Sequence, residues 1–160
     1  MQVTIFAVGR MKSGPEKELA ARYLDRFSAC GSSLGLSFNG VVEMPESRAA
    51  EADARKREEY AVLKKKLPSD TALIALDEHG QNIESTQFSR ILSTLNDSGQ
   101  RNLGIAIGGA DGHDRQLLDA AQQTIAFGKM TWPHQIVRIL LAEQLYRAST
   151  ILAGHPYHRH

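Results

Sequence analysis

Apolar positions along this chain form two patterns: short, nearly continuous runs, and longer stretches with helical spacing. The short runs hardly alternate with polar residues, which is typical of strands buried on both faces of a sheet. They predict strands at residues 3–8, 34–44, 71–76, 103–107 and 124–127. The longer stretches predict helices at residues 15–31, 47–67, 85–96, 114–121 and 133–152. This alternation predicts an α/β fold, with a mostly parallel sheet that has helices on both faces.

The second predicted strand contains a competing turn signal. Asn39 and Gly40 lie within residues 34–44, and an Asn-Gly pair is a strong signal for a two-residue β-hairpin turn. These residues are therefore compatible with either one strand or a hairpin.

The helix predicted at residues 47–67 is dense in charge and has only a thin apolar stripe, formed by Tyr60, Leu63 and Leu67. We expect it to be exposed along most of its length. Residues 64–66 are all lysine. They either complement the helix dipole at a solvated C-terminus or contact RNA.

The last predicted helix is apolar around most of its circumference. Its apolar positions are Ile136, Val137, Ile139, Leu140, Leu141, Ala142, Leu145, Ala148, Ile151 and Leu152. A helix on a sheet normally has one face in water, so burial on every side requires a second covering surface. A second copy of the chain supplies it most simply, and we expect a homodimer. Glu143 and Arg147, four residues apart, are spaced to pair on that surface.

Length and composition indicate one globular domain, expected over residues 1–160, with 42% hydrophobic and 23% charged residues. The lone Cys30 excludes an internal disulfide and a cysteine-rich zinc site, and it points to a reducing compartment. No apolar run approaches the ~18 residues of a membrane span, and the N-terminus does not have the charge order of a signal peptide. We expect a cytoplasmic protein with no membrane partner.

Charge is nearly balanced, at a formal +1, which argues against a protein that coats nucleic acid indiscriminately. The C-terminal fifth is nevertheless basic. It holds Lys129, Arg138, Arg147 and Arg159, with Glu143 as its one acidic residue. This asymmetry suits a phosphate-bearing partner held at one place, or it is a set of helix-surface cations and a solvated tail.

Ligands of open α/β sheets gather beyond the carboxyl ends of the strands. Glycine directly after a strand lets backbone approach a ligand, and Met130 and Trp132 suit an apolar wall for an adenine-like ring. The candidate cofactor-binding residues at predicted strand ends are Leu76, Gly108, Gly109, Phe127, Gly128, Lys129, Met130, Thr131 and Trp132. The glycine cluster at residues 108–112 is also compatible with an ordinary turn.

The sequence has no G-x-G-x-x-G after the first strand and no G-x-x-x-x-G-K-[ST], and its one G-x-S-x-G run, at residues 31–35, ends a predicted helix instead of joining a strand to a helix as a nucleophile elbow does. Dinucleotide-binding, P-loop and α/β-hydrolase interpretations therefore lose their main support.

The tail after the last helix combines aromatic, imidazole and guanidinium groups, in the run His155-Pro156-Tyr157-His158-Arg159-His160. These histidine spacings after a proline do not share one helix face, and no carboxylate completes a ligand set, so we expect no metal. Tyr157, His158 and Arg159 are suited to hold a base and a phosphate. The same residues are also compatible with a frayed terminus.

Several of these segments together resemble one known family. They are Ile107-Gly108-Gly109-Ala110-Asp111-Gly112, Lys129-Met130-Thr131-Trp132-Pro133-His134-Gln135, Arg138 with Glu143-Gln144-Leu145-Tyr146-Arg147-Ala148, and His155-Pro156-Tyr157-His158-Arg159. The combination resembles the bacterial ribosomal RNA large subunit methyltransferase H family, a minimal branch of the SPOUT methyltransferases, over the whole chain.

The resemblance implies a C-terminal trefoil knot, S-adenosylmethionine held at the strand ends named above, and an obligate homodimer. The implied reaction methylates N3 of a pseudouridine in a 23S rRNA stem-loop, in the assembled ribosome. His155, Tyr157 and His158 are candidates to handle the proton that this nitrogen loses or to orient the base. Candidates to anchor phosphates or stabilise charge on the uracil oxygens are Arg138, Arg147 and Arg159, the last of which is also a catalytic candidate.

Two alternatives stay open at this point. A ribosome-associated RNA-binding protein of the same fold would lack catalysis and give no heat with S-adenosylmethionine. A nucleotide-dependent oxidoreductase would require affinity for NAD.

Overall fold

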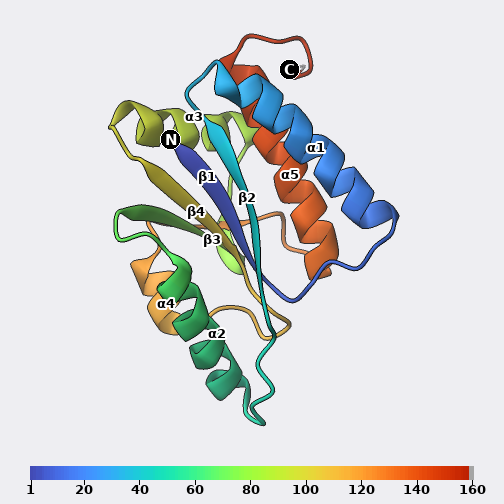
Figure 1. The fold of residues 1–160 in the computed structure, drawn as a ribbon, viewed down its shortest axis with the longest axis vertical. Coiled ribbons are helices and arrows are strands. Elements are labelled where there is room, and N and C mark those ends of the chain that lie inside the picture. The colour runs from blue at the N-terminus through green and yellow to red at the C-terminus, as the bar shows by residue number, and fades with distance from the viewer. Residues whose placement is uncertain (159–160) are drawn as a thin grey trace.

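A single five-stranded sheet organises the chain, which the computed structural model describes over residues 1–158 (Figure 1). The strands are β1 (Gln2–Val8), β2 (Ser37–Met44), β3 (Thr71–Asn82), β4 (Asn102–Ile107) and β5 (Gln123–Ala126). Their order across the sheet is β2-β1-β4-β3-β5, and every neighbouring pair is parallel. Their carboxyl ends therefore meet at one edge of the sheet.

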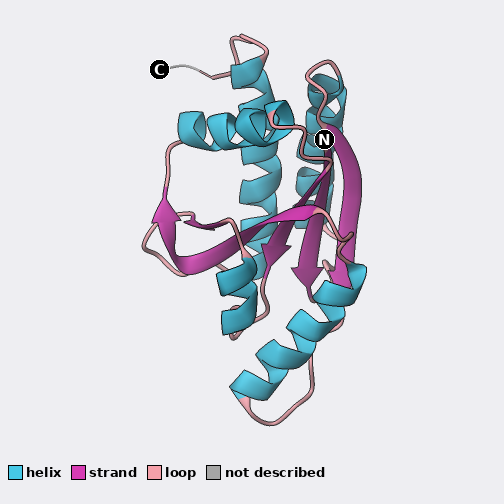
Figure 2. Cartoon of the chain, turned by 90° about the vertical axis from the view of Figure 1, so that its left-hand side faces the viewer, coloured by secondary structure: helices cyan, strands magenta, loops and turns pink. Residues whose placement is uncertain are grey.

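Helices cover both faces of the sheet, as the sequence predicts (Figures 1 and 2). They are α1 (Pro15–Ser32), α2 (Ala52–Lys66), α3 (Ser85–Asp97), α4 (Arg115–Ala120) and α5 (His134–Leu152). Successive side chains of a strand point to opposite faces, so β1 contributes to two cores. Val3 and Ile5 pack with α1, α3 and α5, whereas Phe6 and Val8 pack with Leu63 of α2 and its neighbours.

The Asn-Gly pair of β2 forms no hairpin, so that interpretation was wrong. β2 begins at Ser37 and runs parallel to β1, and consecutive residues of β1 pair with Phe38 and Gly40. Asn39 is left out of the register, as in a β-bulge. Gly40 has φ +104°, which few residues other than glycine adopt at low cost.

Two predicted boundaries move because of long-range contacts. α2 starts at Ala52 rather than residue 47, since residues 47–51 are held in a non-helical path by hydrogen bonds to later residues of α2. β3 continues to Asn82 because its end pairs again with β5, where a Cβ on Gly80 would lie 2.6 Å from backbone of Ile125.

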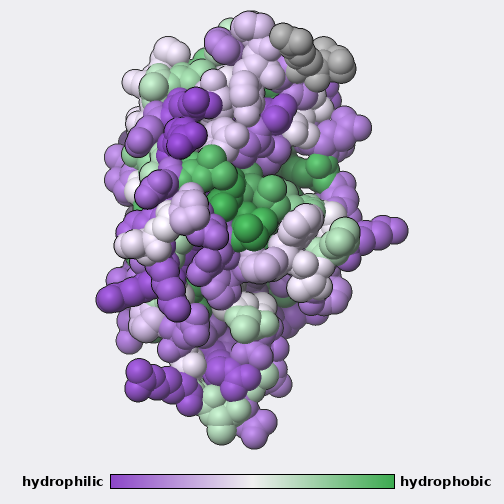
Figure 3. All heavy atoms as spheres, turned by 90° about the vertical axis from the view of Figure 1, so that its right-hand side faces the viewer, coloured by the Kyte–Doolittle hydropathy of each residue, from purple (hydrophilic) through white to green (hydrophobic). Residues whose placement is uncertain are grey.

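α5 is buried along one side only within the single chain. Leu141 and Leu145 are fully buried against α1 and α3, whereas Ile136, Ile139 and Leu140 are half-buried. The side of the molecule that carries α1 and α5 shows an apolar patch (Figure 3). One chain therefore does not bury α5 on every side. The trefoil knot implied by the family resemblance stays a prediction. No helix within residues 1–158 is long and apolar enough to span a membrane.

Candidate active site

A cavity of about 690 Å³ opens at the carboxyl ends of β3, β4 and β5. Its size is within the range of small-molecule sites. Of the candidate cofactor-binding residues, those that line it are Leu76, Gly108, Gly109, Phe127, Gly128, Met130, Thr131 and Trp132. Lys129 is the exception, since its side chain is exposed and it does not line the cavity. The first turn of α5 completes the wall with His134 and Val137.

The turn at residues 108–112 presents backbone to the cavity. A Cβ on Gly108 would lie 2.9 Å from the carbonyl oxygen of Gly112, so only glycine fits without movement of the turn. Gly112 has φ +79°, and its N–H donates to the carbonyl oxygen of Gly109 at 3.1 Å. The turn is therefore closed on itself, with no side chain between its glycines and the cavity.

Residues 127–132 form a second wall that is tied to β3. The N–H of Gly128 donates to Asn82 Oδ1 at 2.8 Å, and the hydroxyl of Thr131 lies 3.3 Å from Glu78 Oε2. Trp132 Nε1 donates to the carbonyl oxygen of Phe127 at 3.0 Å, which fixes the indole ring. Met130 is 72% exposed and Trp132 is 41% exposed. These large apolar side chains are thus available to a flat ring.

Polar residues that sequence reasoning did not propose also line the cavity. His113 Nε2 lies 3.0 Å from the carbonyl oxygen of Leu76, and burial lowers the pKa of the imidazole. Asp77 Oδ1 accepts the N–H of His79 at 3.0 Å. Both Asp77 and His113 directly follow residues that were proposed, Leu76 and the glycine turn. Their place in the sequence could have suggested them.

Of the predicted catalytic residues of the tail, Tyr157 is held by contacts with α5. The hydroxyl of Tyr157 donates to Glu143 Oε1 at 3.1 Å, and the same oxygen accepts Arg147 Nη2 at 2.6 Å. The Arg147 guanidinium also lies 5.0 Å from the centre of the Tyr157 ring. Burial, followed by hydrogen bonds to Tyr23 and Glu143, raises the pKa of Tyr157, so the phenol keeps its proton at neutral pH.

The tail and the cavity lie at opposite ends of α5 (Figure 1). His134 lines the cavity, and Leu152 ends the helix next to the tail, a separation of roughly 27 Å at 1.5 Å per residue. One chain therefore does not bring the predicted cofactor-binding and catalytic residues together. His155 is exposed and His158 is half-buried, and Arg159 lies outside the described residues.

The two candidate RNA-binding arginines within residues 1–158, Arg138 and Arg147, have different surroundings. Arg138 is only 5% exposed, and it donates to Glu43 and to the carbonyl oxygens of Val8 and Gly9. In this position it has no surface for a phosphate, and it joins α5 to the end of β1 instead. Arg147 is partly exposed and paired with Glu143. Among the described residues, no cluster of His, Cys, Asp and Glu is arranged to hold a metal ion.

Comparisons with known proteins give consistent matches. A family model described as a predicted SPOUT methyltransferase matches residues 1–158. The chain is 59% identical to proteins of Rhizobium etli (strain CFN 42) and Rhizobium meliloti and 58% identical to one of Agrobacterium fabrum, over 99% of each chain. These relatives are named ribosomal RNA large subunit methyltransferase H.

A solved structure also resembles the chain. It is described as a probable methylase family protein from Haemophilus influenzae Rd KW20, and it matches with a TM-score of 0.57 at 12% identity. The match spans 99% of this chain and 70% of that one, and it supports the fold alone.

Proposed function

Because the chain belongs to the ribosomal RNA large subunit methyltransferase H family of SPOUT methyltransferases, we propose that it methylates N3 of a pseudouridine in a stem-loop of 23S rRNA. Methyl transfer to large-subunit rRNA follows from membership of the family. The pseudouridine, its nitrogen and the assembled ribosome as substrate are the proposed part. Since ribosomes are cytoplasmic in bacteria, we expect the protein to act there.

The observation that carries the proposal is the cavity, in which a glycine-rich turn faces an apolar wall. The turn at residues 108–112 and the wall at residues 127–132 would hold S-adenosylmethionine, with Met130 and Trp132 against its adenine ring. When bound, this group supplies a methyl on a positively charged sulfur. Asp77 and Glu78 of β3 bring negative charge to the same cavity, which suits a cationic ligand.

We further propose that the working unit is a homodimer in which one chain's cavity meets the partner's tail. The half-buried apolar residues of α5 provide a surface for the second chain. The separation along α5 supports the same arrangement, since the tail has no path to its own chain's cavity while it packs on Glu143. A solution mass of two chains is the expected result by light scattering.

The tail residues would then act on the target base. The pKa of Tyr157 is raised and its hydroxyl already donates to Glu143, so Tyr157 is suited to orient the base rather than to accept its proton. His155 and His158 are the candidates for proton acceptor, and Arg147 and Arg159 for contacts with phosphate or uracil oxygens. The chemical step otherwise needs only that nitrogen and methyl be held in line.

The direct test is methylation of ribosomes purified from cells that lack the gene. Purified protein and S-adenosylmethionine should add one methyl group to a pseudouridine of 23S rRNA, detected by mass spectrometry of nuclease fragments. Free 23S rRNA is the control for the need for the assembled ribosome. Unchanged pseudouridine mass after incubation would reject the proposal.

Calorimetry separates the inactive alternative from the enzyme. A binding protein that kept the fold without catalysis should give no heat with S-adenosylmethionine. An oxidoreductase should instead bind NAD. Heat with S-adenosylmethionine alone supports the methyltransferase.

A further inference from the structure

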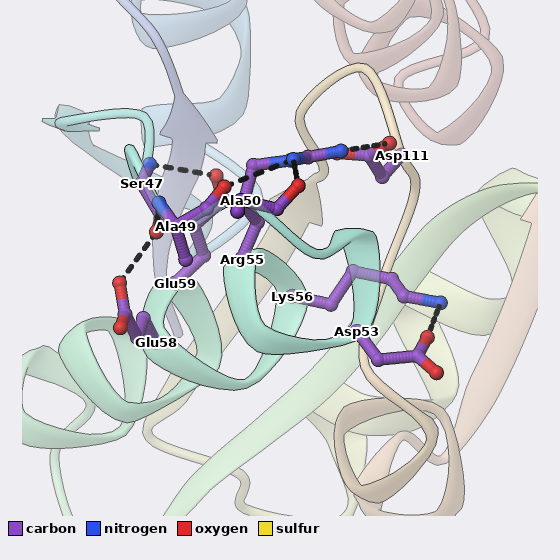
Figure 4. A network of polar contacts seen from close by, with 9 residues as sticks. All are labelled: Ser47, Ala49, Ala50, Asp53, Arg55, Lys56, Glu58, Glu59 and Asp111. Carbon is purple, nitrogen blue, oxygen red and sulfur yellow. Dashed lines mark hydrogen bonds and ion pairs between the residues drawn. The ribbon is translucent and has the colours of Figure 1, made fainter.

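The glycine turn of the cavity is held from outside by α2, a helix to which the proposed reaction assigns no role (Figure 4). Only two residues of α2 are buried, Glu59 and Leu63. Glu59 and Arg55 both reach toward the turn at residues 108–112, one under it and one at its outer edge. α2 thus contacts the turn mainly through charged side chains.

Arg55 joins three segments of the chain with four hydrogen bonds. Its Nε donates to Asp111 Oδ2 at 2.6 Å and its Nη2 to Asp111 Oδ1 at 3.0 Å. Its Nη1 donates to the carbonyl oxygens of Ala49 and Ala50 at 2.9 and 2.7 Å. A bidentate arginine–carboxylate pair fixes orientation as well as distance. The guanidinium, itself anchored to the segment before α2, therefore fixes the direction of the Asp111 side chain.

Glu59 supports the same turn from beneath. A Cβ on Gly109 would lie 3.3 Å from Glu59 Oε2 and 3.1 Å from Val8 Cγ1, so the turn's backbone packs directly on this carboxyl group. Glu59 Oε1 accepts the N–H of Ser47 at 3.0 Å, which holds the carboxyl group in place. The turn is thus held between the Glu59 carboxyl group beneath it and the Arg55–Asp111 ion pair at its outer edge.

Asp111 is the turn's one ionisable side chain. The other residues of 108–112 are glycine and alanine, which have no side-chain groups with which to form polar contacts. The Asp111 pair with Arg55 is therefore the one side-chain ion pair available to fix the position of these five residues. The hydrogen bond from Arg55 also lowers the pKa of Asp111, so the pair stays ionised at neutral pH.

We propose that Arg55 is a positioning residue for methyl-donor binding, acting through Asp111 to hold residues 108–112 in the conformation that the donor contacts. This inference rests on the proposed function. A loose turn must be ordered when the donor binds, and that ordering weakens affinity. The expected kinetic signature is a higher KM for S-adenosylmethionine, with kcat at saturating donor and KM for the ribosome unchanged.

The test compares Arg55→Ala, Asp111→Asn and the double variant with Arg57→Ala, which removes an exposed arginine from the same helix. Hydrogen exchange of the free full-length protein should become faster in residues 108–112 of the first three variants and not in Arg57→Ala. In the first three variants the Kd for S-adenosylmethionine, measured by calorimetry, should rise about 10-fold. The double variant should be no weaker than either single one, because both act through one contact. Arg55→Lys should not restore affinity, since lysine makes no bidentate pair.

Each outcome decides a separate part of the inference. Unchanged exchange in residues 108–112 of Arg55→Ala would overturn it, and so would faster exchange with unchanged donor affinity. If hydrogen exchange in Arg55→Ala is faster in all strands, the whole protein has lost stability. Asp111→Asn, which keeps the side-chain shape, then provides the decisive measurement. If the unaltered protein binds no S-adenosylmethionine, the proposed function fails, while the exchange data still show whether Arg55 holds the turn.

Discussion

Replacing Gly108 by alanine tests the donor site at a crowded backbone position. The new Cβ would lie 2.9 Å from the carbonyl oxygen of Gly112 and 3.0 Å from its carbonyl carbon. Both are backbone atoms, so the turn itself must shift. Forced shifts of this kind cost about 1–3 kcal/mol. If the donor contacts this turn, that cost raises the Kd of S-adenosylmethionine about 5- to 150-fold, at 1.4 kcal/mol per factor of ten.

A matched control lies four residues earlier, on β4, the strand that leads into the turn. A Cβ on Gly104 would meet only side-chain atoms, of Leu67, Phe6 and Thr71, each at 3.2 Å. Gly104→Ala should therefore lower the melting temperature somewhat and leave donor affinity as it is. Calorimetry and thermal unfolding of both variants complete the comparison. A folded Gly108→Ala protein that binds the donor as tightly as the unaltered chain would refute our assignment of the turn.

Two further predictions concern stability. Arg138→Met should lower the free energy of unfolding by about 1–3 kcal/mol in urea titrations, because two carbonyl oxygens at the end of β1 lose their donor. Arg57→Met, on the exposed helix surface, should change the free energy of unfolding little. Equal effects of the two substitutions would contradict the role given to Arg138. Burial lowers the pKa of His113 below its ordinary 6.5, so below that pH the unfolded chain binds a proton that the folded chain does not. Stability should be complete above about pH 6.5 and fall as the pH decreases, and His113→Gln should reduce that fall; the same pH dependence in both proteins would be evidence against it.

The strands were predictable because parallel strands buried on both faces leave a direct sequence signal. Residues 103–107 are all buried, and β4 begins only one residue earlier than predicted. Asn39 and Gly40 misled because their local preference for a turn is overridden by pairing with β1, which uses the positive φ of Gly40 for a bulge. Local propensity gives way here to tertiary contacts.

The cavity walls were predictable for the same reason, since Leu76 ends a predicted strand and the glycines and residues 127–132 come after strands. The support of the turn was not, because it depends on distant contacts. Arg55 and Asp111 are 56 residues apart, and nothing in the sequence of α2 distinguishes Arg55 from Arg57. Nor does the sequence show that His155 and Tyr157 lie far from the cavity of their own chain. That follows from the length and direction of α5.

If one chain's cavity meets the partner's tail, as proposed above, the opposite placement of cavity and tail makes the two functions genetically separable. Suppose one full-length variant is inactivated in the turn and another in the tail, for example at Tyr157. If subunits exchange at random, about half of the dimers are mixed, and each mixed dimer regains one intact centre, for about a quarter of full activity. Mixing the two inactive proteins would thus restore methyltransferase activity. If each centre were formed within a single chain, the mixture would remain inactive.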